Sequence, residues 1–281
     1  MRRRSFMVPT LAGFGFAFLY IPIVSLIIYS FNNSRLVTVW DAANSPTLKW
    51  YGRLFQNDQI MGAAWLSIKI AFVNATGAAI IGTLAGFVLA RFKNFHLRTL
   101  FSGMVTAPLV MPEVITGLSL LLLFVSMEQF IGWPRGRGVT TITIAHITFS
   151  MSYVAVIIQS RLASFDNSLE EAALDLGARP LTVFRRITLP LIMPAVISGW
   201  AMSFVLSWDD VVISQFVAGP GSSTLPMVIF SKVRLGVSPD VNALATLLIL
   251  IVGAGVVGSA IWLQKQEKRR EREMRMAAAD A

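Results

Sequence analysis

Residues 168–190 read SLEEAALDLGARPLTVFRRITLP and join two long apolar segments of the chain. Ser168 and Glu171 have the spacing of a capping box, in which each side chain satisfies a backbone donor at the start of a helix. Gly177 is placed to end this short helix in a left-handed turn. Pro180 then favours the first turn of a second helix, which runs on into the next apolar segment. The stretch therefore predicts a helix, a sharp bend and another helix.

The apolar segments on both sides are long enough to cross a bilayer, which takes about 20 residues of helix. The fourth segment is rich in Thr and Ser and contains His146, so we expect it to pack inside a bundle. We expect one all-α transmembrane domain over residues 1–281. Its spans are residues 8–31, 61–90, 100–127, 139–160, 190–218 and 241–264, with a loop at 161–189 and a tail at 265–281.

Composition supports a membrane protein and excludes several other classes. Of the 281 residues 55% are hydrophobic and only 14% are charged, whereas soluble domains carry about a quarter charged residues. The chain has no cysteine, which excludes disulfides, thiolate metal sites and thiol nucleophiles. His96 and His146 are far apart in sequence, so we expect no metal site. The net charge of +9 comes from cations that flank apolar runs, which argues against nucleic-acid binding.

The distribution of Lys and Arg predicts the orientation. With the N-terminus inside, the inner segments carry 16 of the 24 Lys and Arg residues, the outer segments carry seven, and Lys69 lies within the second span. The positive-inside rule then places both termini in the cytoplasm. Arg3-Arg4 before an apolar run also resembles an export signal, but the run is long and no small-residue cleavage site follows it. We therefore expect a retained first helix.

The loop between the fourth and fifth spans matches a known motif. It contains Glu171-Ala172-Ala173, then Gly177, then Ile187-Thr188-Leu189-Pro190, and this pattern resembles the EAA loop of ABC-importer permeases. The resemblance implies a type I importer permease fold (MetI-like) in a bacterial inner membrane. It also implies that the short helix is a coupling helix that docks on an ATPase subunit. Glu171, Ala172, Ala173, Gly177 and Arg179 are the expected coupling residues.

The chain itself is not expected to be an enzyme. No phosphate-binding loop of the G-x-x-x-x-G-K-[ST] type occurs in it. ATP and magnesium are therefore expected on the partner ATPase, and this chain is expected to bind no cofactor and no metal.

Three acidic side chains, Glu113, Asp209 and Asp210, fall inside the expected spans. A charge at the centre of a span costs about 2.5–3.5 kcal/mol on insertion scales, so it needs a partner or a function. Glu113 is expected near mid-depth, after Pro108 and Pro112, which would kink or break the helix there. Asp209 and Asp210 are expected in the outer half of the membrane, about 100° apart around their helix.

No Arg or Lys is expected at the same depth to neutralise these carboxylates. Carboxylates that line a path would favour a cationic solute, helped by cation–π contact with an aromatic residue such as Trp50, Tyr51 or Trp208. One alternative is that the aspartates cap the outer end of the fifth span in the headgroup region. For Trp50 and Tyr51 the alternative is an aromatic belt at the membrane interface.

A narrower resemblance covers nearly the whole chain. The segments at residues 31–40, 49–51, 107–120, 131–134, 206–211, 219–226 and 237–245 resemble the permeases of polyamine importers, most of all the second permease subunit of putrescine systems. The resemblance implies that Trp50, Glu113, Ser207, Asp209 and Asp210 take part in polyamine passage, and we add Tyr51. Relatives often have aspartate in place of Glu113 and Leu or Met in place of Trp208. The charge argument survives both changes.

The expected partners are a homologous second permease subunit, two ATPase subunits, a periplasmic polyamine-binding protein and the lipid membrane, with no nucleic acid. The expected substrate is putrescine, with spermidine next. The alternatives are a related ABC importer for another small solute and, in a different class, an ion-coupled secondary transporter that uses the acidic residues as ion sites. A membrane anchor without transport would not need buried acids.

Overall fold

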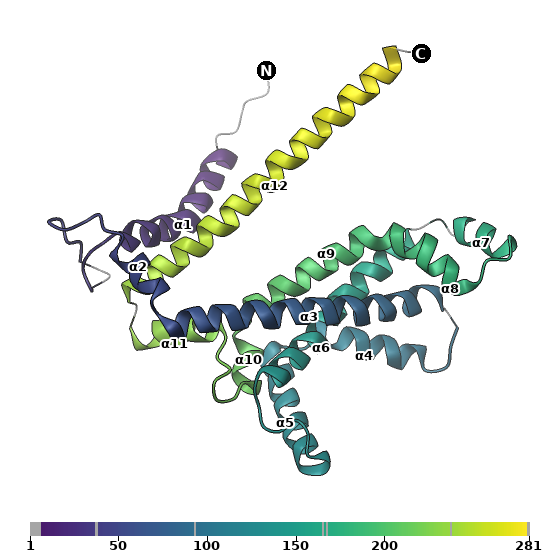
Figure 1. Ribbon diagram of the computed structural model, residues 1–281, viewed down its shortest axis with the longest axis horizontal. Helices are drawn as coiled ribbons and strands as arrows, with labels where there is room; N and C mark the ends of the chain where they lie inside the picture. The colour runs from purple at the N-terminus through teal and green to yellow at the C-terminus, as the bar shows by residue number, and fades with distance from the viewer. Residues whose placement is uncertain are drawn as a thin grey trace. The chain divides into compact units, whose positions relative to one another are not determined.

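The computed structural model describes residues 7–279 except 37, 38, 93, 165, 167 and 237, and this part of the chain is helical and contains no strand. Figure 1 shows the helices. Their bounds are α1 Met7–Ser30, α2 Lys49–Phe55, α3 Asp58–Arg91, α4 Arg98–Val110, α5 Glu113–Ile131, α6 Val139–Ala163, α7 Ser168–Asp175, α8 Pro180–Val183, the π-helical turn η1 Phe184–Thr188, α9 Leu189–Trp208, α10 Val212–Val217, α11 Leu225–Leu235 and α12 Pro239–Ala279.

Six of the described helices are long and apolar enough to cross a membrane: α1, α3, α5, α6, the continuous run from α8 to α9, and α12. This confirms the prediction of an all-α protein with six transmembrane helices.

The third expected span, residues 100–127, is divided into α4 and α5. Met111 adopts an extended conformation, with φ −75° and ψ 134°, and Pro112 follows it. A residue that precedes proline is disfavoured in the helical region because the proline ring crowds its backbone. The expected fifth span, residues 190–218, is also divided, because α9 ends at Trp208 and the short α10 begins at Val212.

The structure separates into two units, Met1–Asp58 with Lys232–Ala281, and Gln59–Ser231. In the first unit α1 packs along α12, and α2 also packs on α12. The side chains of α1 are mostly exposed within this unit, with Phe14 and Phe18 each 72% exposed. Such a surface is suited to lipid or to a partner helix.

In the second unit, α6 lies at the centre of the packing and contacts α4, α9 and α10. Two glycines of α3 permit close approach to α6. A Cβ atom on Gly82 would lie 2.6 Å from the carbonyl oxygen of Met151, and one on Gly86 would lie 2.6 Å from that of Ala155. Small residues at helix contacts are typical of membrane proteins, where van der Waals packing holds helices together in lipid.

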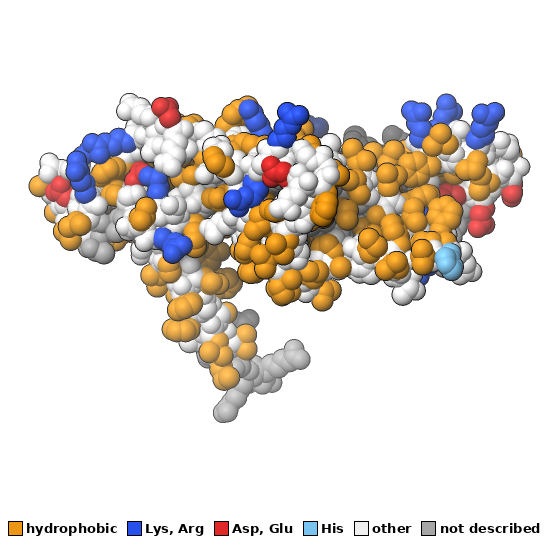
Figure 2. Space-filling view, turned by 90° about the horizontal axis from the view of Figure 1, so that it is seen from below, with side chains coloured by type: hydrophobic (Ala, Val, Ile, Leu, Met, Phe, Trp, Pro, Cys, Tyr) orange, Lys and Arg blue, Asp and Glu red, His pale blue; other side chains and the backbone are white. Residues whose placement is uncertain are grey.

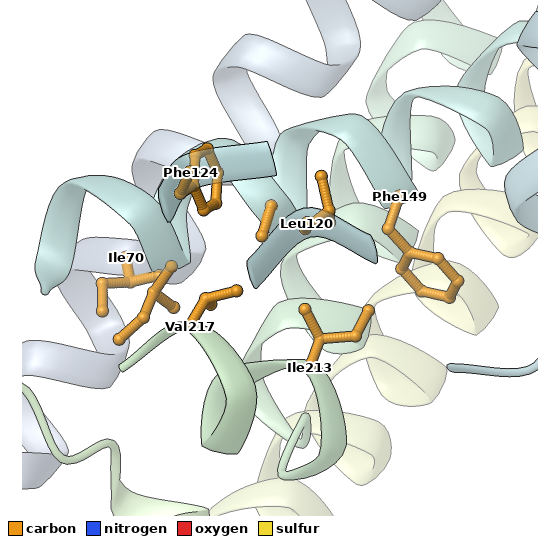
Figure 3. Packing of buried hydrophobic residues seen from close by; sticks show 8 residues of the cluster. Ile70, Leu120, Phe124, Phe149, Ile213 and Val217 are labelled. Atoms are coloured by element: carbon orange, nitrogen blue, oxygen red, sulfur yellow. The ribbon is translucent and has the colours of Figure 1, made fainter. Parts of the chain in front are cut away.

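One end of the second unit is built on a compact apolar cluster. Ile70, Leu120, Phe124, Phe149, Ile213 and Val217 meet there, together with Ile142 and Ala145, and they come from α3, α5, α6 and α10 (Figure 3). Phe124 is 3% exposed, while Val217 is fully buried. The cluster fixes α10, and therefore the bend between α9 and α10 that contains Asp209 and Asp210.

The space-filling view shows hydrophobic side chains over much of one face of the molecule (Figure 2). Within the second unit, α7 and α8 lie at one end of α9 and α10 lies at the other (Figure 1). The predicted coupling loop and the pair Asp209 and Asp210 therefore lie at opposite ends of the same membrane-spanning helix.

Candidate functional site

The bend after α9 is held by the side chain of Asp210. Its Oδ1 accepts a hydrogen bond from the backbone N–H of Ile213 at 3.1 Å, and its Oδ2 accepts one from the N–H of Ser214 at 2.8 Å. These donors belong to the first turn of α10, where backbone N–H groups lack partners inside the helix. Asp210 therefore caps α10 in the way that an aspartate caps a helix start.

The same carboxylate also meets His146, a buried residue of α6. The Nε2 atom of His146 lies 3.1 Å from Asp210 Oδ2 and 3.1 Å from the hydroxyl of Ser214, and its Nδ1 lies 2.7 Å from the hydroxyl of Ser207. A neutral ring protonated on Nε2 satisfies this set, because Nε2 donates to Asp210 and Nδ1 accepts from Ser207. Asp210, Ser207 and Ser214 are thus joined through one histidine.

Asp209 differs from its neighbour. Its side chain is exposed, whereas that of Asp210 is only 9% exposed. Among the described residues, no other side chain makes a hydrogen bond or ion pair with the Asp209 carboxylate. Both aspartates lie in the bend between α9 and α10, where one faces the protein and the other faces away from it. Of the predicted acidic pair, only Asp209 is free to meet a solute.

A row of aromatic rings on α9 leads to Asp209. The rings of Trp208 and Phe204 stack with centroids 6.3 Å apart, and those of Phe204 and Trp200 stack at 5.6 Å. The Trp200 indole N–H donates to the hydroxyl of Thr76 on α3 at 3.2 Å, which fixes the end of the row that is farthest from Asp209. The spacing of four residues puts all three rings on one side of the helix.

Glu113 is the first residue of α5, and its side chain is exposed. Pro108 lies inside α4, whereas the chain breaks at Met111 and Pro112, as the proline at 112 predicted. One turn later, Gly117 allows α5 to approach α10 closely, since a Cβ atom there would lie 2.7 Å from the ring of Phe216. Glu113 is thus one helical turn from the contact between α5 and α10.

Trp50 and Tyr51 belong to the first unit, and both have protein partners there. The Trp50 indole N–H donates to the carbonyl oxygen of Asn32 at 2.7 Å, and the Trp50 side chain is 5% exposed. The Tyr51 hydroxyl lies 2.7 Å from the hydroxyl of Ser30. These bonds fasten α2 to the end of α1 and to the segment that follows it.

The cations of Lys49 and Arg53 lie 5.2 Å and 5.1 Å from the centroid of the Trp50 ring. Cation–π contact of this kind already satisfies the ring electrostatically. Within its unit, Trp50 is therefore held by neighbouring residues before any solute arrives.

The predicted coupling loop has the expected bend. Gly177 has φ +82°, its N–H donates to Leu174 O at 2.9 Å, and the N–H of Ala178 donates to Ala173 O at 3.0 Å. This pair of bonds is a Schellman motif, which closes a helix on a left-handed residue. Pro180 is the first residue of α8, as the sequence predicts. Gly177 and Pro180 act within one turn of the chain, which explains why the bend could be predicted from the sequence.

The helix start differs from the prediction. The Ser168 N–H donates to Asp166 Oδ1 at 3.0 Å, so Asp166 takes the capping role that the sequence assigned to Ser168. This bond holds the pKa of the Asp166 carboxyl below its usual value. Glu171 is consequently released from a capping box, and its side chain is exposed, as are those of Ala172 and Arg179.

Sequence reasoning did not single out Glu170. Its Oε1 accepts hydrogen bonds from Arg91 Nη2 at 2.8 Å and from the Thr188 hydroxyl at 2.6 Å. Arg91 ends α3 and Thr188 ends η1, so the bond partners are 79 and 18 residues away in the chain. No local pattern reports such a contact. The burial of His146 was expected, but its bond to Asp210 was not, for the same reason.

Residues 82–272 match the model of the family described as binding-protein-dependent transport system inner membrane component. The chain belongs to this family. It is a permease subunit of an ABC importer, a multi-pass inner-membrane protein and not an enzyme. Among the described residues, no group of three His, Cys, Asp or Glu side chains is arranged to hold a metal ion.

Individual relatives give more detail. The permease is 56% identical over 265 residues to the putrescine transport system permease protein PotI of Escherichia coli K12. The aligned residues are 94% of this chain and 92% of that protein. It is 42% identical over 253 residues to the spermidine/putrescine transport system permease protein PotC of the same organism. The aligned residues are 90% of this chain and 92% of that protein.

Solved structures agree with the fold. A bacterial ABC transporter involved in the import of the acidic polysaccharide alginate matches with a TM-score of 0.70 at 16% identity, over 93% of this chain and 98% of that one. The MetNI methionine ABC transporter matches with a TM-score of 0.59 at 17% identity, over 72% of this chain and 94% of that one. At these identities the likeness concerns the fold, and it confirms the predicted MetI-like architecture.

Proposed function

We propose that this permease carries a polyamine, putrescine first and spermidine next, across the bacterial inner membrane. The observation that carries the proposal is the free carboxylate of Asp209 at the end of an aromatic row, in a chain 56% identical to a putrescine permease. Putrescine carries two separated ammonium groups, which could be met by the carboxylate of Asp209 beside Trp208 and by a second carboxylate, that of Glu113.

The chemistry of the site divides among its residues. Asp209 accepts charge-assisted hydrogen bonds from one ammonium group, and the neighbouring Trp208 offers its ring face for cation–π contact. Glu113 supplies a second exposed carboxylate. Asp210 and Ser207 act indirectly, because His146 holds both and they fix the bend on which Asp209 stands. Trp50 and Tyr51 hold α2 in place and contribute to passage from there.

The proposed assembly contains a homologous permease subunit, two ATPase subunits that bind ATP and magnesium, and a periplasmic polyamine-binding protein. The binding protein delivers the polyamine to the outer face. Closure of the ATPase dimer moves α7, and the spans rotate to expose the site inward. The docking surface is formed or shaped by Glu171, Ala172, Ala173, Gly177 and Arg179. All of them except Ala173 are exposed, and Gly177 fixes the turn that ends α7.

The test is uptake of labelled putrescine and spermidine by proteoliposomes that contain the complete complex and the binding protein. We expect accumulation only with internal ATP, and competition by unlabelled putrescine but not by an anionic solute of similar size. ATP-independent uptake by this chain alone would contradict the proposal and favour a secondary transporter. Uptake of another solute class with no polyamine uptake would contradict the substrate assignment and leave the importer in place.

A further inference from the structure

Glu170 lies where three segments of the second unit meet. Its carboxylate pairs with Arg91 at the end of α3 and accepts the hydroxyl of Thr188 at the end of η1. The Glu170 and Arg91 side chains are only 16% and 17% exposed, and Thr188 is 2% exposed. One oxygen atom of the coupling helix α7 is therefore bonded to two different membrane-spanning helices.

The local backbone explains how this contact forms. The left-handed turn at Gly177 reverses the chain, so that α8 and η1 run back past α7, and α7 packs on both. The turn at Phe184–Thr188 is π-helical, which is wider than an α-helical turn and inserts one extra residue before α9. Single π-turns within longer helices are found frequently at functional sites. Here the π-turn contains the threonine that meets Glu170.

We propose that Glu170 is a positioning residue that transmits movement of the coupling helix into α3 and α9. A docked ATPase would push on the exposed side of α7, where Glu171 points. Glu170, about 100° around the helix, faces inward and is bonded to the spans. The two adjacent glutamates thus have separate tasks, with Glu171 at the docking surface and Glu170 as the connection behind it.

A charged and partly buried connection suits this task better than a loop alone. Arg91 and Glu170 form a charge-assisted hydrogen bond, which is shorter and stronger than a neutral one. Phe184 of η1 also packs on Phe87 of α3, with ring centroids 5.0 Å apart, but this contact lies outside α7. Among the described residues, Glu170 makes the only side-chain hydrogen bonds between α7 and the spans. Without the connection, α7 would shift on docking while α3 and α9 follow less completely.

The first experiment compares transport with ATP hydrolysis in the reconstituted complete complex. Glu170→Gln and Thr188→Val should assemble with the ATPase and hydrolyse ATP, but the uptake per ATP should fall by roughly tenfold, the low end of the range for one lost hydrogen bond to a charged group. Glu267→Gln, an exposed glutamate of α12, and Thr182→Val, an exposed threonine of α8, are the matched controls. An unchanged ratio of uptake to hydrolysis in both test variants overturns the proposal.

The second experiment separates transmission from simple folding. Arg91→Glu combined with Glu170→Arg exchanges the two charges, and this double variant should recover most of the ratio that either single variant loses. Loss of ATPase binding in Glu170→Gln, measured by copurification, would assign Glu170 to docking and would contradict its role as a connection.

The third experiment does not depend on the substrate, so it distinguishes failure of this inference from failure of the proposed function. Because the sequence lacks cysteine, Asp175→Cys on α7 and Leu84→Cys on α3 provide unique spin-label sites. The labelled pair should give a narrow distance distribution that shifts with ATP. Adding Glu170→Gln should broaden it and reduce the shift. An identical distribution with and without Glu170→Gln overturns the inference, whatever the complex transports.

Discussion

Asp209 and Asp210 are neighbours in the chain but have different surroundings. Asp210 is nearly buried and accepts bonds from two backbone N–H groups and from His146, whereas Asp209 is exposed and receives none of these. A carboxylate that is already satisfied gains little from a substrate ammonium. A free one gains a charge-assisted hydrogen bond, which contributes about 1.5–3 kcal/mol.

Asp209→Asn is expected to reduce polyamine uptake at low substrate concentration by about 10- to 100-fold, because that range corresponds to the loss of one such bond. The thermal stability of the purified complex should stay within error, since no other side chain among the described residues bonds to the Asp209 carboxylate. Asp58→Asn, at an exposed carboxylate in the first turn of α3, serves as the control. Initial uptake rates over a series of concentrations provide the measurement, and normal uptake by Asp209→Asn would contradict the site.

His146→Ala is expected to lower the thermal stability of the permease. The change leaves the Asp210 carboxylate and the Ser207 hydroxyl without their buried partner, at a cost of about 1–3 kcal/mol for such a group. His146→Gln keeps a donor and an acceptor and should lose less. Thermal unfolding in detergent compares the two variants, and equal midpoints for both and for the wild type would show that the cluster does not stabilise the bend.

At the scale of the helix, α3 and α6 are held together by close packing of their backbones. Gly82 and Gly86 lie against backbone carbonyl oxygens of α6 and leave no room for a side chain. In lipid, the hydrophobic effect does not drive two helices together, so the van der Waals contacts of close packing hold them. A single added methyl group there separates the backbones.

Gly86→Ala is expected to destabilise the contact between α3 and α6 by about 1–3 kcal/mol, the usual range for overpacking. Gly62→Ala is the matched control on the same helix, because no atom lies within 4 Å of a Cβ built there. Alanine favours helix over glycine, so the control should be neutral or slightly more stable. Thermal unfolding of both variants in one detergent tests this, and a stable Gly86→Ala protein would contradict the close packing.

The bend of the coupling loop and the helical spans could be predicted because their signals are local. Gly177 and Pro180 act within one helical turn, and hydropathy is read along one segment. The bond from Glu170 to Arg91 and that from His146 to Asp210 join residues 79 and 64 apart, and no neighbouring residue announces either. The two helix breaks were partly predictable. The prolines predicted the break at Met111, whereas the break at Asp209 depends on the side-chain cap that Asp210 provides.

At the scale of the whole molecule, the six spans and the excess of Lys and Arg on one side predict cytoplasmic termini. The chain without cysteine allows a direct test with single introduced thiols. Ala43→Cys, in the segment between α1 and α2, should react with a membrane-impermeant maleimide in intact spheroplasts. Ala278→Cys, near the end of α12, should react only after lysis. The reverse pattern would invert the topology and place the coupling loop on the wrong side of the membrane for an ATPase.

The interruption of α9 at Trp208 has an electrostatic consequence of its own. The peptide dipoles of a helix add along its axis and leave about half a negative charge at the C-terminal end, carried by the last carbonyl groups. Asp209 stands at this end. The backbone therefore makes the end of α9, where the proposed path begins, attractive to cations before any side chain is counted. Discrimination against anions should persist when the Asp209 carboxylate is replaced by an amide.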